Sequence, residues 1–374
     1  MSTANASKFS WNAARKRDEI LEPYERKRSC TVLRRESGSN PAYLADYFDI
    51  TRQLGVAYLD LTSGEHLINV LEPRMWTSSE EQPDLDAPAA FREKSMLSQH
   101  ISFLRDFFRS YKPFDEAQID TIEIMLGKLY RKWNIGDETD FSRLKPSDYP
   151  TLSDLYQVME QEYQKILTNT GNELYTPELL RSACLGLHSM CIGADAKFFN
   201  GYTNVDASRF VTFGVKDLME SGKNIKDAML FNILSYISHA LISGGNTAGI
   251  FEELHVFLSN PMAVSYIRNA MKRVRKRNSL IVLASQNISD FLLPEVAEMT
   301  KPLFSIPTHH FLFHPGTIDK RDYMDALQLE ETEYQLILAC QTGSCLYKCG
   351  DERYNLVVKT PEHKLALYGK GGGR

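Results

Sequence analysis

Long apolar runs are missing from this sequence. None approaches the ~20 consecutive apolar residues that a helix needs to cross a bilayer, and the first residues lack the apolar stretch of a secretory signal. The six cysteines are scattered without a Cys-x-x-Cys pair, which argues against a structural zinc site. These absences predict a cytoplasmic protein with reduced thiols, or one held at a membrane by its partners. The net charge of −5 gives no overall argument for binding nucleic acid.

A glycine-rich phosphate-binding loop is missing as well. No Gly-x-x-x-x-Gly-Lys-Ser/Thr pattern occurs anywhere in the 374 residues. The acidic pair that usually accompanies such a loop is nevertheless present, because the apolar run at 248–251 ends in Glu252 and Glu253. In nucleotide-hydrolysing proteins one such carboxylate lies near Mg²⁺ and the next polarises the attacking water. The alternative is an ordinary helix start, where the helix dipole favours acids.

The order of hydrophobic patterns predicts an α/β protein with a helical insertion. Strand-like runs alternate with helical ones before residue 91 and after residue 209, whereas apolar residues recur every three to four positions between them. The strands are expected at 31–33, 56–61, 209–215, 248–251, 280–284, 309–313, 336–340, 344–347 and 355–358. The predicted divisions are a polar segment at 1–30, a first α/β part at 31–90, an all-α insertion at 91–200, a second α/β part at 201–362 and a glycine-rich flexible tail at 363–374.

Three further features of the sequence are helix caps in the insertion, a polar segment after the strand at 280–284, and a basic run at 268–277. Asp115 and Thr151 with Asp154 are expected to cap helices of the insertion. Ser285-Gln286-Asn287 follows the predicted buried strand at 280–284, where a polar side chain can sense a bound phosphate or cap the next helix. Six basic residues lie between 268 and 277, a run typical of a solvated helix face, an arginine finger or a surface for nucleic acid phosphates.

Several motifs taken in order resemble the conjugation ATPases of type IV secretion systems, the VirB-four or TraC-like class related to the HerA/FtsK motors. The resemblance covers about residues 30–360. The motifs that carry it are Asn200-Gly-Tyr-Thr-Asn-Val-Asp206, Phe213-Gly-Val-Lys-Asp-Leu218, Phe251-Glu-Glu-Leu-His-Val-Phe257, Arg275-Lys-Arg-Asn278, Ser285-Gln-Asn287 and Gly343-Ser-Cys-Leu-Tyr-Lys348.

The resemblance implies a RecA-like P-loop NTPase core, a mostly parallel sheet with helices on both faces, into which an all-α domain is inserted. It further implies ATP and Mg²⁺ as ligands, a hexamer, other secretion components as partners, and a place at the inner face of the cell membrane. By position, Glu252 corresponds to the magnesium-binding acid, Glu253 to the catalytic acid and Gln286 to the sensor. Arg275 corresponds to an arginine finger that acts on a neighbouring subunit.

The sequence departs from this family where the phosphate loop belongs. Ser7-Lys8-Phe9-Ser10 resembles the end of that loop, which makes Lys8 and Ser10 the candidate nucleotide contacts, but its glycines are absent. The family's first core strand and large N-terminal domain are not found in these residues either, so two interpretations stay open: a truncated or decayed motor chain, or a fragment of a working ATPase whose missing part supplies the loop. We therefore expect weak or no ATP hydrolysis by this chain alone. The alternative is a non-catalytic module that binds DNA or a secretion partner through the basic 268–277 helix, with Arg273, Arg275 and Arg277 as the DNA contacts.

Overall fold

The computed structural model describes residues 29–32, 57–77, 86–168, 174–205, 210–258, 260–285, 288–294, 296–316, 318–341, 343–359 and 361–363. Among the predicted site residues, Lys8, Ser10 and Gln286 lie outside these ranges. None of the described helices combines the length and the hydropathy that a membrane span requires.

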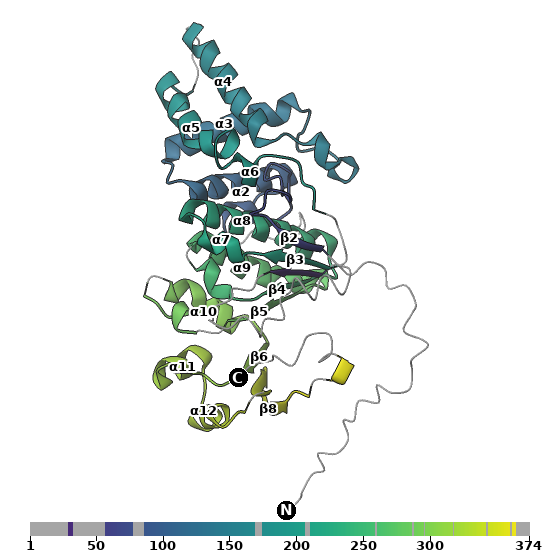
Figure 1. Cartoon of the computed structure of the whole chain (residues 1–374), viewed down its shortest axis with the longest axis vertical. Coiled ribbons are helices and arrows are strands. Elements are labelled where there is room, and N and C mark those ends of the chain that lie inside the picture. Colours follow the sequence, from purple (N-terminus) through teal and green to yellow (C-terminus); the bar gives the residue numbers. More distant parts are fainter. Residues whose placement is uncertain are drawn as a thin grey trace, which may run out of the picture.

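A five-stranded parallel sheet forms the centre of the molecule, with the strand order β2-β3-β1-β4-β5 (Figure 1). In register, Ala248 lies opposite Leu280 and Phe251 opposite Leu283. Because every pairing is parallel, all five strands end at the same edge of the sheet. The strands are β1 Ser29–Val32, β2 Ala57–Asp60, β3 Phe210–Gly214, β4 Ala248–Phe251 and β5 Leu280–Leu283.

Two helices, α8 (Lys223–His239) and α9 (Pro261–Val274), connect the strands of the second half of the sheet. Asn260 caps α9 by accepting hydrogen bonds from the amides of the next turn. After α8 the chain makes a π-helical turn, Ala240–Gly244, and leaves it at Gly245, whose φ of +62° favours glycine. This turn leads into β4, and the acidic pair follows directly after β4.

The helical block contains α2 (Met96–Tyr111), α3 (Glu116–Lys132), α4 (Leu152–Thr168), α5 (Pro177–Cys191) and α6 (Ala196–Phe199). The predicted cap at Asp115 is confirmed, since Asp115 and Gln118 form a capping box. The predicted pairing of Thr151 with Asp154 is confirmed as well, with the Thr151 amide 2.8 Å from Asp154 Oδ2. In Figure 1, α3, α4 and α5 form a projection at the top, while α2 lies lower, next to α8.

The apolar core is continuous between the sheet and α2. Trp76 is fully buried and its ring contacts Phe103 of α2 and Tyr266 of α9 at centroid distances of 5.1 and 4.6 Å. The Tyr266 hydroxyl donates to Asp106 Oδ2 of α2 at 3.0 Å. The boundary predicted at residue 91 stays a prediction, but the core crosses it without interruption.

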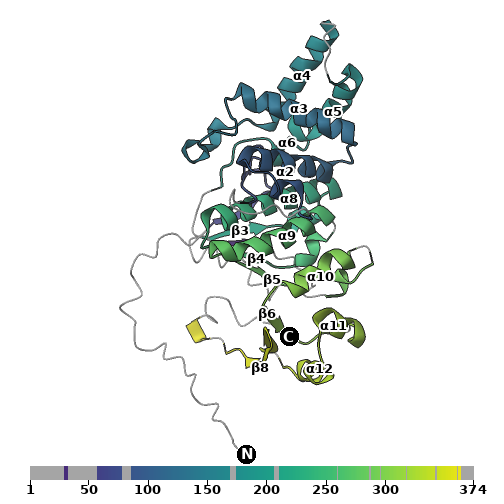
Figure 2. The ribbon, with the colours of Figure 1, turned by 180° about the vertical axis from the view of Figure 1, so that it is seen from behind.

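A second, three-stranded antiparallel sheet follows in the order β6-β7-β8 (His309–Leu312, Ser344–Cys349 and Glu352–Val357). Figure 2 shows it from behind at the lower end of the molecule, with α11 (Lys320–Leu327) and α12 (Glu331–Leu338) beside it. Short helices complete the described fold: 3₁₀ turns at Ala89–Phe91, Phe141–Arg143, Pro146–Asp148, Leu254–Phe257, Arg275–Arg277 and Ile288–Phe291, and α7 Lys216–Glu220 and α10 Ala297–Ser305.

The strand predicted at 336–340 is wrong, because α12 occupies most of this stretch. A capping box between Glu330 and Glu333 starts the helix. Tyr334 and Ile337, three residues apart, then face the same side and pack with Leu346 of β7 in a small second core. The short apolar run at 336–340 is compatible with either a strand or a buried helix face, and packing decides between them.

The prediction that 280–284 is a buried strand is also partly wrong. β5 forms, but it lies at the edge of the sheet, and its residues are alternately exposed and partly buried. β3, β4, β6 and β7 are found within two residues of the predicted limits, whereas β8 begins three residues before the predicted start at 355. The α/β class is therefore confirmed.

Candidate functional site

The carboxyl end of β4 holds the acidic pair. Glu252 is partly buried and Glu253 is 7% exposed. Glu253 has left-handed backbone angles, φ 51° and ψ 47°, which cost a residue with a side chain about 1 kcal/mol or more. The Leu254 amide donates to the Ala284 carbonyl at 3.0 Å, and the Ala284 amide donates to the Phe251 carbonyl at 2.8 Å. These bonds fix the two acids where β4 and β5 end side by side.

The segment after the acids is held by the core. It forms a 3₁₀ turn, Leu254–Phe257, in which Leu254, Val256 and Phe257 are buried. Between them, His255 places Nδ1 3.4 Å from Glu253 Oε2, close enough for an ion pair when the ring is protonated. Sequence reasoning did not single out His255. The only indication of His255 in the sequence is its position two residues after Glu253.

The remaining predicted residues lie at two different ends of the sheet. Ser285 is exposed directly after β5 and therefore near the end of β4, whereas Gln286 is not described. Arg275 is exposed before β5 begins. A four-residue strand spans about 13 Å, so the structure does not bring Arg275 to Glu252 and Glu253 of the same chain. Its action on a neighbouring subunit stays a prediction.

Arg273 is not available for DNA, and the prediction that it contacts DNA is wrong. It is only 6% exposed, its guanidinium lies 4.8 Å from the centre of the Phe91 ring, and Nη1 donates to the Asn269 carbonyl at 3.0 Å. It follows Tyr266 and Ala270 by seven and three residues, so it shares their buried face of α9. Arg275 is exposed and Arg277 is partly exposed.

Among the described residues, the acidic pair is the group whose chemistry suits a bound Mg²⁺. Mg²⁺ is commonly held by one or two carboxylates together with substrate phosphates, and Glu252 with Glu253 fits that requirement. Over the ranges that the structure describes, no group of three or more acids, histidines or cysteines is arranged to hold a metal ion by itself. No phosphate-binding glycine loop exists in the sequence. The two carboxylates could hold Mg²⁺, but by themselves they do not enclose the phosphates of a nucleotide.

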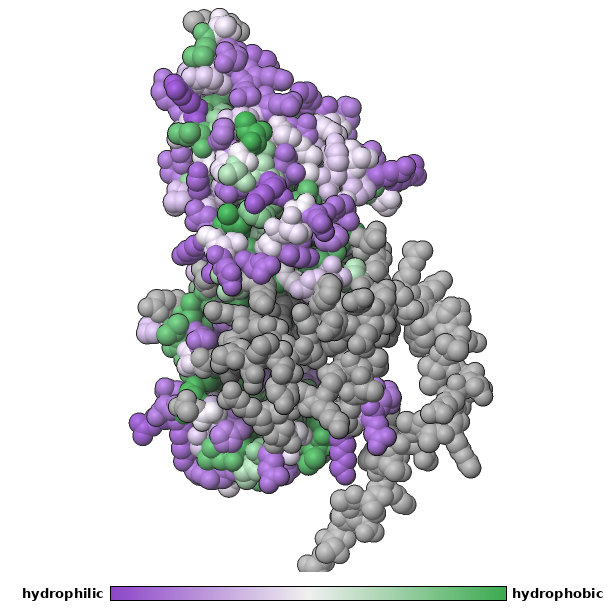
Figure 3. Space-filling model, in the orientation of Figure 1, coloured by the Kyte–Doolittle hydropathy of each residue, from purple (hydrophilic) through white to green (hydrophobic). Residues whose placement is uncertain are grey.

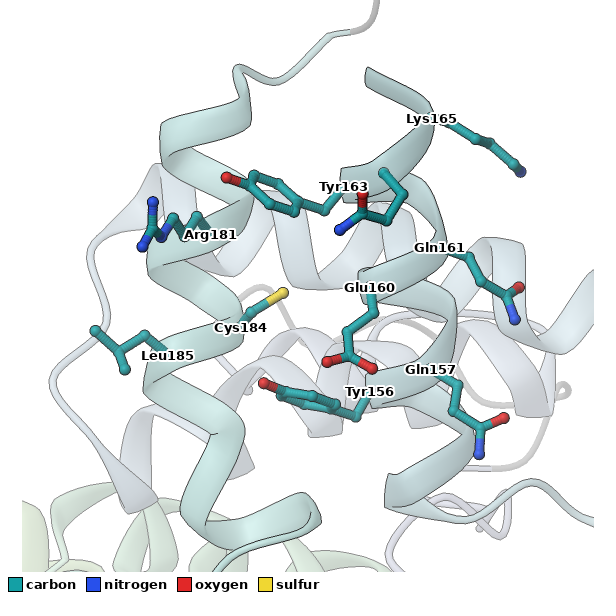
Figure 4. Close-up of a pocket in the computed structure, with 10 residues that line it drawn as sticks. Tyr156, Gln157, Glu160, Gln161, Tyr163, Lys165, Arg181, Cys184 and Leu185 are labelled. Atoms are coloured by element: carbon teal, nitrogen blue, oxygen red, sulfur yellow. The ribbon is translucent and has the colours of Figure 1, made fainter. Parts of the chain in front are cut away.

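Two cavities among the described residues lie away from the acids. One of ≈ 960 Å³ opens between α4 and α5, where Tyr156 and Tyr163 point from α4 toward Cys184 and Arg181 of α5 (Figure 4). Another, of ≈ 430 Å³, adjoins the start of α8 and is lined by Tyr111, Asp195 and Lys223 among others. On the face shown in Figure 3, hydrophobic residues form small separate patches over the helical end and the lower end. Neither cavity is lined by Glu252 or Glu253.

Comparison with known proteins gives one consistent result. VirB4 of Thermoanaerobacter pseudethanolicus superimposes with a TM-score of 0.72 at 26% identity, over 91% of this chain and 83% of that chain. The type IV secretion system protein CagE of Helicobacter pylori is 30% identical over 97 residues, 26% of this chain and 10% of CagE. A probable conjugal transfer protein TrbE of Sinorhizobium fredii is 28% identical over 136 residues, 34% of this chain and 19% of that protein. No family model matches the chain.

The parallel sheet and the match to VirB4 together place the chain in the RecA-like class of P-loop ATPase folds. Within that class, the chain is a homologue of the type IV secretion ATPases of the VirB4/TraC class. The matched segments cover 10% and 19% of the two curated relatives.

Proposed function

We propose that this chain supplies the carboxylate half of an ATP-hydrolysing motor site in conjugative type IV secretion. One observation carries the proposal: the turn after β4, tied to the end of β5 by the Leu254–Ala284 bond, holds Glu252 and Glu253 at the edge where all strands end. Ligands of open parallel sheets bind at that edge. Glu252 would hold Mg²⁺ and Glu253 would orient the attacking water.

The further assignments belong to the same proposal. ATP and Mg²⁺ are the ligands, Gln286 is the sensor, and Arg275 acts on a neighbouring subunit of a hexamer. Lys8 and Ser10 are the candidate phosphate contacts within this chain. The partners are other type IV secretion components, which place the protein at the inner face of the cell membrane. The resemblance to a secretion ATPase supports each of these assignments.

Nucleotide titration tests whether the chain by itself binds ATP. Without a row of glycine amides around the phosphates, we expect no saturable binding of a fluorescent ATP analogue with Mg²⁺ up to about 1 mM. Glu252→Gln and Glu253→Gln are expected to behave like the unaltered chain in this titration. Micromolar binding that Lys8→Ala abolishes would contradict the expected impairment and would place a phosphate loop near residue 8.

A second candidate function is a DNA-binding surface at the end of α9. Arg275 and Lys276, which are exposed, and Arg277, which is partly exposed, form a basic turn between α9 and β5, and such a turn favours contact with phosphates. We expect Arg275→Ala with Arg277→Ala to weaken DNA retention at every sequence tested. The slope of log affinity against log salt should become shallower by about 0.9 for each phosphate that is no longer neutralised.

The matched control for DNA binding is Arg131→Ala with Arg143→Ala, which removes two exposed arginines from the helical projection. This control is expected to leave retention unchanged. Equal retention by both double variants would contradict a DNA site at this turn. Filter binding at several salt concentrations gives both the affinity and the slope.

A further inference from the structure

The helices α4 and α5 border a groove with a charged and aromatic lining. Its volume is ≈ 960 Å³, and Tyr156, Glu160 and Tyr163 point into it from α4, opposite Cys184 of α5 (Figure 4). The ring centroid of Tyr156, near the start of α4, lies 5.8 Å from that of His188, near the end of α5, so the two helices run antiparallel. Most of the side chains that border the groove are exposed, which makes it accessible to a partner.

Both helices carry a stripe of side chains along this side. Successive members are spaced by four, three and four residues, which places each stripe along one face of its helix. The stripes are Tyr156, Glu160, Tyr163 and Leu167 on α4, and Arg181, Leu185, His188 and Ile192 along α5. Leu185 is 74% exposed and Leu167 is 56% exposed, although both are apolar. Helices that pack against further helices carry apolar residues at this spacing, so the pair fits a helical partner.

The groove has one acid and one base on opposite helices. Glu160 and Arg181 are both exposed, and none of the ion pairs among the described residues includes either of them. Burial, followed by the charge of Glu160, raises the pKa of the Cys184 thiol to about 11, so this carboxylate acts inside the groove. An occupant is therefore favoured when it brings a cation to Glu160 and an anion to Arg181. A second copy of the same groove brings both.

We propose that this groove binds the same groove of a second copy of the chain across a twofold axis. Arg181 lies at the level of Tyr163, one helical turn from Glu160 (Figure 4). An axis that crosses both helices between these two levels exchanges them, so Glu160 of each copy comes beside Arg181 of the other, and the contact is self-complementary. The two copies then point in opposite directions. Because α4 and α5 belong to the projection at one end of the molecule, their sheets stay apart (Figures 1 and 2).

The size of this face indicates a weak dimer. The helix α4 has 17 residues and is therefore about 25 Å long. Two adjacent helices of about 10 Å diameter then cover about 500 Å² in each copy, or about 1,000 Å² in the complex, which is the lower limit of specific interfaces. We therefore expect a dissociation constant on the order of 10–100 µM and a monomer at about 1 µM. This dimer is separate from the ring of subunits in the proposed function, which involves Arg275.

Sedimentation velocity of the whole chain from about 1 to 200 µM tests the dimer. Glu160→Arg and Arg181→Glu each place like charges at both contacts of the pair, so each variant alone is expected to raise the dissociation constant at least about tenfold. An equimolar mixture of the two variants is expected to return to within about threefold of the unaltered value. In that mixture each acid of one chain meets a base of the other, because the two reversals compensate one another.

Two exposed charges outside the groove provide the matched controls. Glu138→Arg and Arg131→Glu reverse charges of the same helical block, in side chains that do not line the groove. Each is expected to leave the dissociation constant unchanged. All four substitutions change exposed side chains, so every variant is expected to fold, and circular dichroism with thermal unfolding at about 1 µM verifies this on the monomer.

Loss of the dimer in each single reversal, together with its recovery in the mixture, would support the proposal. A monomer throughout the concentration range would overturn it, and so would a dimer that both reversals leave intact. Loss without recovery in the mixture would contradict the twofold pairing of Glu160 with Arg181. Association that Arg275→Ala abolishes and both reversals spare would belong to the ring of subunits, and it would likewise overturn a dimer at this groove.

Discussion

Replacing Trp76 by alanine is expected to lower the free energy of unfolding by about 4 kcal/mol. Removing a fully buried large aromatic residue loses its transfer free energy and leaves a cavity, which together cost about 3–5 kcal/mol. Trp76 has no exposed surface, and its ring meets Phe91, Phe103 and Tyr266 at centroid distances of 5.4, 5.1 and 4.6 Å. It therefore joins the segment after β2 to α2 and α9.

This loss is large because a domain of ordinary stability has only about 5–15 kcal/mol in total. Urea denaturation of Trp76→Ala and Trp76→Phe measures it, and the phenylalanine variant is expected to recover a substantial part of the difference. Leu185→Ala, at a residue 74% exposed, serves as the control and is expected to change stability by less than about 0.5 kcal/mol. A decrease below about 1 kcal/mol for Trp76→Ala would show that this cluster is loosely packed.

Gly245→Ala is expected to cost about 2–3 kcal/mol. Its φ of +62° lies in the region that side chains disfavour, and an added Cβ would lie 2.8 Å from the Arg277 carbonyl oxygen. That oxygen also accepts from the Asn246 amide at 3.1 Å, so it cannot move away freely. The strain would fall on the turn that leads into β4 and thus on the position of the acidic pair.

The neighbouring glycine is a matched control for this prediction. An added Cβ at Gly244 would meet nothing within 4 Å, and its φ is not in the left-handed region. Gly244→Ala is therefore expected to be neutral, or to stabilise the chain by up to about 1 kcal/mol through the unfolded state. Thermal or denaturant unfolding of both variants gives the comparison, and equal effects at the two positions would refute the explanation by backbone conformation.

The sequence predicted those features that depend on local pattern. β4 was expected at 248–251 and is found there, because a short apolar run is followed directly by charged residues. The cap at Asp115 and the pairing of Thr151 with Asp154 follow from spacing alone and are confirmed. The acids were placed at the end of a strand by the same reasoning, and the structure holds them there.

Features that depend on packing could not be predicted in this way. The basic run at 268–277 reads as one surface, but the helical period buries Arg273 against Phe91 and exposes Arg275. The left-handed turn at Glu253 has no sequence signal, since glycine or asparagine would be expected in such a conformation. The exposure of β5 depends on which strand pairs with its outer edge, and the sequence of β5 itself indicates the opposite.

The hydrogen bond between Tyr266 and Asp106 determines at which residues the helical block could be separated from the sheet without disrupting the core. Together with the bond from Asn260 Nδ2 to Ser110 Oγ, it attaches α2 to α9 along the last turns of α2. Replacing the whole helical block from residue 91 onward would therefore also remove α2, which covers part of the core of the sheet. An exchange that begins after Tyr111 and ends before α6 would replace α3, α4 and α5 and leave α2 in place. The unit that could be exchanged without opening the core of the sheet is then the distal projection, because α2 packs with the sheet.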